Sequence, residues 1–242
     1  MDQVAIPKAD LDQLLASAGQ AILVGGQALA FWIAFYKIPM NDAPVAFVTK
    51  DADFLGSFED AERLSAAVGG ALEVPKGITI LTGIVKKRLS ANEEYEVDVL
   101  WRLNGLSAED VTKRAKDIEV QESGVRFRVM SPVDCLISRL ENLRTIHEKR
   151  NDSGVWQARM AVRVARSHIS EVLDKGEEKI AIRAATDILN AALQPMGLNA
   201  FKTYDIDALE AIPIEKYQTK AFVTQQWEIS VKRIRNARKL SH

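Results

Sequence analysis

The pattern of hydrophobic residues changes at Ser131-Pro132, and this change limits the possible folds of the 242-residue chain more than any other feature. Upstream, helical periodicity alternates with short apolar runs bounded by glycine and polar turns, a pattern typical of strands connected by helices. Downstream, only helical patterns follow, near residues 132–149, 154–174, 177–193 and 213–239. We therefore predict an α+β fold, with a mixed sheet flanked by helices in residues 1–130 and a helical bundle in residues 131–242.

The first 130 residues contain the patterns of both element types. Helices are predicted over Lys8–Ala18, Gln27–Lys37 and Phe58–Val68, with a short fourth one capped by Ser107. Strands are predicted over Ala21–Val24, Val45–Val48, Ala71–Val74, Ile78–Val85, Tyr95–Trp101, Ile118–Gln121 and Val125–Val129. The strand ending at Val24 runs directly into a glycine pair and the next helix.

Composition excludes several classes of protein. With 47% hydrophobic and 27% charged residues, the chain is neither collagen-like nor wholly disordered. One cysteine, Cys135, forms no internal disulfide and supports no cysteine-based zinc site. No apolar run approaches the roughly 18–20 residues that cross a bilayer, and the acidic start does not resemble a signal peptide. We expect a soluble cytoplasmic protein that does not enter a membrane.

The two halves of the chain differ in charge although the whole is nearly neutral. Residues 1–110 hold 9 basic and 16 acidic side chains, whereas residues 111–242 hold 23 basic and 17 acidic ones. Such an asymmetry favours two modules with different tasks, the second of which is suited to an anionic partner.

The informative cluster of residues consists of Gly25, Gly26, Asp51, Asp53 and Asp98. Asp51 and Asp53 are two apart in an extended segment, so both carboxylates face the same side, where they repel each other unless a cation lies between them. Asp98 interrupts an apolar strand, in which an isolated ionised carboxylate is costly. Carboxylates are the ligands that Mg²⁺ takes together with substrate phosphates, and three acids can hold two ions. The glycine pair before a helix lets the backbone approach a phosphate.

These residues resemble the nucleotidyltransferase (polymerase β-like) superfamily. LVGGQALAFW is similar to its phosphate loop, TKDADFLG to its metal-binding strand, and YEVDVLW to the strand that carries its third acid. SPVDCLISRL resembles the helix that follows the sheet in the bacterial AbiEii-type abortive-infection toxins. The resemblance covers residues 20–145, with a longer segment than usual between Gly26 and Asp51.

The resemblance implies a role for each matching position. Asp51, Asp53 and Asp98 would be the catalytic, metal-binding acids, with two Mg²⁺ ions as cofactors. Nucleotide binding would involve Gly25, Gly26 and Gln27, and also Arg139 and Lys149 as basic residues near the triphosphate. The implied activity is transfer of a nucleoside monophosphate from an NTP to a hydroxyl of RNA, such as tRNA, or of a protein. The implied setting is a toxin–antitoxin or phage-defence system, with a cognate antitoxin as partner.

Two other functions stay open at the level of sequence. The first is a catalytically silent nucleotide-binding or regulatory protein, and the second is a nucleotidyltransferase that modifies a small molecule such as an antibiotic.

The helical half also allows two interpretations of its cations. Arg159, Arg163 and Arg166 form one helical stripe, which is either a solvated face with ion pairs or a platform for triphosphate or RNA. The C-terminal residues Lys232, Arg233, Arg235, Arg238 and Lys239 allow the same two readings.

Overall fold

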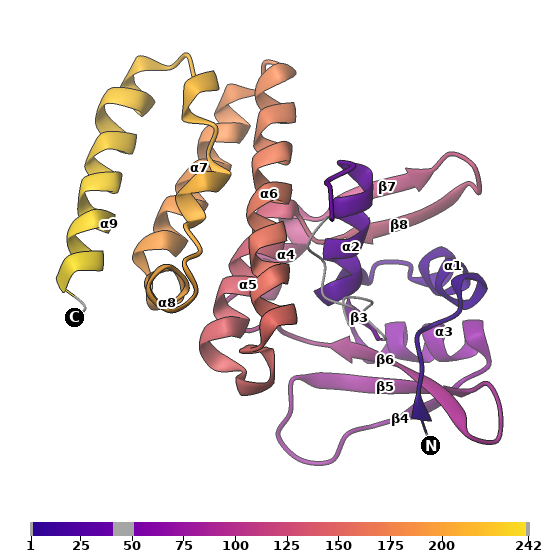
Figure 1. Ribbon diagram of the computed structural model, residues 1–242. Coiled ribbons are helices and arrows are strands. Elements are labelled where there is room, and N and C mark those ends of the chain that lie inside the picture. The colour runs from indigo at the N-terminus through magenta and orange to yellow at the C-terminus, as the bar shows by residue number, and fades with distance from the viewer. Residues whose placement is uncertain (1, 41–50, 241–242) are drawn as a thin grey trace. The chain divides into compact units, whose positions relative to one another are not determined.

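The computed structural model of the chain describes residues 2–40 and 51–240 (Figure 1). Contacts divide the chain into unit 1, Met1–Phe31 with Val45–Ser131, and unit 2, Trp32–Pro44 with Pro132–His242. The helix α2 (Gly25–Phe35) begins in unit 1 and ends in unit 2.

A mixed sheet is the centre of unit 1 (Figure 1). Its strands are β1 (Asp2–Gln3), β2 (Ile22–Val24), β3 (Ala52–Leu55), β4 (Ala71–Glu73), β5 (Leu81–Arg88), β6 (Glu93–Leu100), β7 (Lys116–Val120) and β8 (Val125–Val129). Their order is β4-β5-β6-β3-β2-β8-β7, and β1 pairs with β6. The pairs β1–β6, β3–β6 and β2–β8 are parallel, whereas the other neighbours are antiparallel. Together with the C-terminal helices, this sheet confirms the predicted α+β class.

Helices α1 (Lys8–Ser17) and α3 (Phe58–Val68) pack against each other and against the sheet. The bounds of α3 agree with the prediction because strong local signals set them. The Ser57 side chain accepts a hydrogen bond from the Asp60 backbone, and the Asp60 carboxylate accepts one from the Ser57 backbone. Gly69, with φ +65°, ends the helix. The short helix α4 (Ala108–Arg114) begins after Ser107 as predicted.

Unit 2 is helical throughout its described regular elements. They are α5 (Pro132–Thr145), α6 (Asp152–Asp174), α7 (Glu178–Leu193), α8 (Pro195–Tyr204) and α9 (Glu228–Leu240), with 3₁₀ turns at His147–Lys149, Ala208–Ala211 and Ile214–Lys216 and a π-helix at Phe222–Trp227. Its core includes Leu136, Leu140, Ala161 and Ile169, all fully buried. Cys135 is also buried, in agreement with its apolar setting.

Three sequence expectations were wrong in detail. The helix predicted over 213–239 is interrupted, and α8 was not predicted. The helix predicted from Gln27 starts at Gly25, so both glycines belong to the first turn of α2. The strand predicted over Ile78–Val85 begins at Leu81 and extends to Arg88. The predicted strand Val45–Val48 lies outside the described residues.

Candidate active site in unit 1

Two neighbouring parallel strands place Asp53 and Asp98 side by side. The register of β3 and β6 pairs these two residues directly, on strands that lie about 4.8 Å apart. In-register side chains point to the same face of a sheet, so the two carboxylates share one face. Their chain neighbours Ala52, Val97 and Val99 point to the opposite face and are fully buried. Because β6 lies between β3 and β5, Asp98 is not on an edge strand.

Gly25 lies against the carboxylate of Asp53. A Cβ atom placed on Gly25 would come within 1.8 Å of the Asp53 Oδ2 atom, so no larger residue fits without moving that carboxylate. Gly25 also has φ +65°, a conformation that other residues rarely adopt. The chain therefore turns from β2 into α2 at a glycine, and the first turn of α2 lies at the acidic pair. Negative charge is stabilised at this end of a helix, where the backbone N–H groups have no intrahelical partner.

Asp51 directly precedes β3 and contacts Gln3, which also contacts Glu96. The Gln3 Nε2 atom donates to Asp51 Oδ1 at 3.0 Å and to Glu96 Oε2 at 3.2 Å. Lys86 Nζ lies 3.3 Å from Glu96 Oε1, which places one cation beside the acids. Sequence reasoning missed Gln3 and Lys86. The position of Gln3 depends on pairing of β1 with the distant β6, for which the sequence contains no local signal.

Burial raises the pKa of Asp98 to about 6, and the negative charges of Asp53, Glu96 and Asp51 contribute to the same shift. A carboxylate with such a pKa is still mostly ionised at neutral pH and can accept a proton more readily than an ordinary aspartate. A cation bound here would relieve the repulsion.

The chemistry of the donor set suits Mg²⁺, because all the acids offer hard carboxylate oxygens. Within residues 2–40 and 51–240, however, no group of three or more His, Cys, Asp or Glu side chains could hold a metal ion in this conformation. Asp53 and Asp98 remain as a cross-strand pair. Two carboxylates with substrate phosphates are a common arrangement for Mg²⁺, so the residues present fit the ion in number and type.

The other predicted nucleotide ligands lie on two different units. Gly26 is buried and Gln27 is half-buried in the first turn of α2, on unit 1. Arg139 and Lys149 belong to unit 2, where both border one small pocket. Arg139 is buried in α5 and donates from Nη1 to Gln157 Oε1 at 3.0 Å, whereas Lys149 is exposed.

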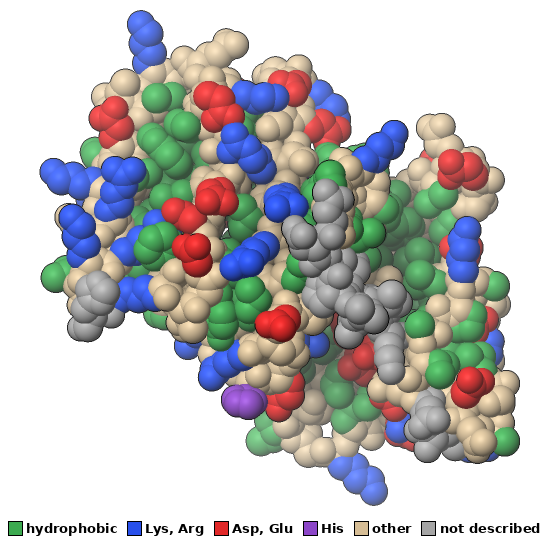
Figure 2. Space-filling model, in the orientation of Figure 1, with side chains coloured by type: hydrophobic (Ala, Val, Ile, Leu, Met, Phe, Trp, Pro, Cys, Tyr) green, Lys and Arg blue, Asp and Glu red, His purple; other side chains and the backbone are tan. Residues whose placement is uncertain are grey.

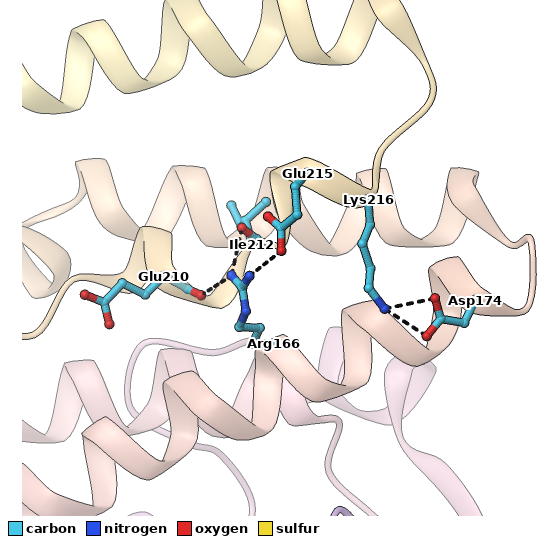
Figure 3. Close-up of polar contacts among 6 residues, drawn as sticks. All are labelled: Arg166, Asp174, Glu210, Ile212, Glu215 and Lys216. Atoms are coloured by element: carbon cyan, nitrogen blue, oxygen red, sulfur yellow. Dashed lines mark hydrogen bonds and ion pairs between the residues drawn. The ribbon is translucent and has the colours of Figure 1, made fainter.

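Arg166, in the basic stripe of α6, contacts the segment that follows α8 within unit 2 (Figure 3). Arg166 Nη1 donates to the backbone oxygens of Glu210 at 2.9 Å and Ile212 at 3.4 Å, and Nη2 pairs with Glu215. Arg159 likewise donates to the Tyr204 backbone oxygen at 3.1 Å. Two of the three arginines of the stripe are thus used in packing contacts, which favours the structural interpretation over an RNA platform.

A second buried polar cluster lies within unit 2. The Tyr36 hydroxyl donates to Glu171 Oε2 at 2.9 Å and lies 3.2 Å from His168 Nδ1. His168 is buried, and its contact with Tyr36 is part of the packing of unit 2.

Comparison with protein-family models finds no match for this chain, and comparison with curated proteins finds none either. Among the helices of residues 2–40 and 51–240, none is both long and apolar enough to cross a membrane. The resemblance to nucleotidyltransferases therefore stays a prediction from the sequence motifs.

Proposed function

We propose that this chain is a metal-dependent nucleotidyltransferase that moves a nucleoside monophosphate from an NTP to a hydroxyl acceptor on RNA, such as tRNA, or on a protein. The observation that carries the proposal is the cross-strand pair of Asp53 and Asp98 beside Gly25 at the start of α2. Neither a helix start nor an acidic pair alone indicates this chemistry. Their combination provides sites for both a triphosphate and its cation.

In this proposal Asp53 and Asp98 would hold Mg²⁺, and Asp51 would add a further carboxylate if its contact with Gln3 were released. Bound Mg²⁺ would neutralise charge on the triphosphate and favour ionisation of the attacking hydroxyl. The N–H groups of the first turn of α2 would bind the phosphates, with the amide of Gln27 beside them.

The reaction is an in-line substitution at the α-phosphorus. The acceptor oxygen forms a bond to this phosphorus, the bond to the bridging oxygen breaks, and pyrophosphate leaves. The hydroxyl proton passes to solvent with the assistance of the Asp98 carboxylate, whose pKa would fall again on binding Mg²⁺. Arg139 and Lys149 remain predicted phosphate ligands, and a toxin with a cognate antitoxin remains the setting that the family resemblance implies.

One observation favours the catalytically silent alternative. Asp51 is engaged by Gln3, and no three-acid metal group exists among the described residues as they stand. A regulatory protein would bind an NTP in this conformation without turnover.

The test is transfer of label from each α-labelled NTP, with Mg²⁺, to total RNA or to extract proteins. We expect label on one acceptor class with the wild-type chain and none with Asp53→Asn or Asp98→Asn, while Asp12→Asn, an exposed acid on α1, retains activity. NTP binding without any transfer would favour the regulatory alternative. Equal transfer by the wild type and both site variants would refute the proposal.

A further inference from the structure

The C-terminal helix α9 carries exposed basic side chains that form no ion pair within residues 2–40 and 51–240. Five of its residues are basic and only Glu228 is acidic. Arg238 is part of the packing, because it pairs with Asp207 and its guanidinium lies 3.7 Å from the ring centre of Phe201. Four exposed cations remain on α9: Lys232, Arg233, Arg235 and Lys239. Figure 2 shows Lys and Arg side chains gathered along this helix.

Three of these cations lie in a row. Lys232, Arg235 and Lys239 are three and four residues apart, so they share one side of the helix over about 10 Å. Together with Trp227, Glu228, Val231 and Asn236 they border a shallow groove of about 440 Å³, in which three cations face one acid. We call these three residues the α9 row. Like charges at this spacing repel one another, and an anionic partner would remove that repulsion.

The contacts of the α9 row differ from those of the stripe on α6. Across residues 2–40 and 51–240, no ion pair involves a member of the α9 row, whereas Arg159 and Arg166 of α6 bind backbone oxygens. A stripe that only stabilised the packing of unit 2 would contact backbone oxygens, as Arg159 and Arg166 do.

The apolar side of α9 argues against a membrane surface as partner. Val231 and Ile234 are buried, and α9 packs against α7 and α8, so this side is already covered. A protein partner fits less well than a polyanion, because two of the three residues of the row are lysines, which are depleted in protein interfaces. Regularly spaced phosphates need only a line of cations.

We propose that the α9 row binds the phosphate backbone of an RNA strand. The choice of RNA rests on the proposed function, because the proposed reaction needs a hydroxyl acceptor and RNA carries a 2′-hydroxyl on every nucleotide. The row would add affinity for RNA without selecting its sequence, since backbone contacts carry no sequence information.

The experiment measures binding of a fluorescent mixed-sequence RNA oligonucleotide to the full chain over a series of salt concentrations. The variant is Lys232→Gln/Arg235→Gln/Lys239→Gln. The control is Lys113→Gln/Lys179→Gln/Arg183→Gln, which removes the same charge from exposed positions on other helices. Circular dichroism and thermal unfolding establish that both variants fold as the wild type does.

Counterion release predicts that loss of three phosphate contacts weakens binding on the order of 100-fold near 0.1 M salt and lowers the slope of log affinity against log salt by about 2. The control should bind within a fewfold of the wild type. Wild-type affinity in the α9 variant, an equal loss in the control, or no RNA binding by the wild type would each overturn the inference.

Failure of this inference is distinguishable from failure of the proposed function. Asp98→Asn should bind RNA as the wild type does but transfer no label. If the α9 variant binds RNA normally while Asp98→Asn abolishes transfer, the row is refuted and the reaction stands. Label that reaches single-stranded DNA but not RNA would overturn the choice of RNA.

Discussion

Replacing Asp98 with Asn removes a charge that its surroundings disfavour, and we expect the variant to be more stable than the wild type at neutral pH. The pKa of this carboxyl rises from 3.8 to about 6, which corresponds to about 3 kcal/mol at about 1.4 kcal/mol per pKa unit. Because the side chain is only partly buried, solvent screening reduces the expected gain to about 1–2 kcal/mol.

The sign of the pH dependence follows from proton binding. Between pH 4 and 6 the folded protein holds the Asp98 proton while the unfolded chain has released it, so this residue lowers stability as pH rises through that window. Above about pH 6 both states are ionised and the full cost remains. The advantage of Asp98→Asn should therefore be near zero at pH 4 and complete by pH 7.

Urea unfolding of wild type and variant at pH 4, 5, 6 and 7.5 measures this difference. Asp12→Asn, at an exposed position on α1, is the matched control and should change stability by less than about 0.5 kcal/mol at every pH. A destabilised Asp98→Asn at pH 7.5, or a difference that does not vary between pH 4 and 7.5, would refute the electrostatic account of the site.

Three further expectations concern the glycine turn, the basic stripe and catalysis. Gly25→Ala and Gly176→Ala should each lower the free energy of unfolding by about 1–2 kcal/mol, because both glycines have positive φ. Gly25→Ala should cost more, because only its new Cβ would collide with another side chain, and thermal unfolding of the two variants measures this difference. Arg166→Gln should lower the free energy of unfolding, measured in urea, by about 1–2 kcal/mol through lost hydrogen bonds, whereas Arg163→Gln should lower it by less than about 0.5 kcal/mol. Equal losses in the two variants would contradict the contacts of Figure 3. Because Mg²⁺ must displace the Asp98 proton, a higher Mg²⁺ concentration should lower the pH at which label transfer is half-maximal, and a midpoint that does not respond to Mg²⁺ would contradict the role of Asp98 as a metal ligand.

Local signals explain where sequence reasoning succeeded. The capping pair Ser57 and Asp60 and the glycine at 69 define α3, and each acts within a few residues. The family resemblance led us to expect Asp98 beside the strand of Asp53, and the β3–β6 register places the two residues side by side.

Non-local packing explains where it failed. The helix α8 contains Pro195 and Gly197, which are helix breakers in isolation, but Pro195 is at the start and Gly197 packs so closely that a Cβ would lie 2.4 Å from the Ala191 backbone oxygen. The last helical stretch begins only at Lys220 and continues through the π-helix into α9, so the helical pattern over 213–239 conceals a break between the 3₁₀ turn at Ile214–Lys216 and Lys220. The contact of Gln3 with Asp51 requires β1 to pair with β6, which no local pattern predicts.

The most direct test of the central claim compares ATP labelled at the α-phosphorus with ATP labelled at the γ-phosphorus. Each is incubated with the full chain, Mg²⁺ and total RNA or extract proteins. The same comparison is then made for whichever NTP is preferred. Attack at the α-phosphorus predicts that only the α label reaches the acceptor and that the γ label leaves as pyrophosphate, with both outcomes lost in Asp53→Asn. Transfer of the γ label to the acceptor would contradict the account, because the acids and the α2 start would then serve a phosphotransferase reaction rather than nucleotidyl transfer.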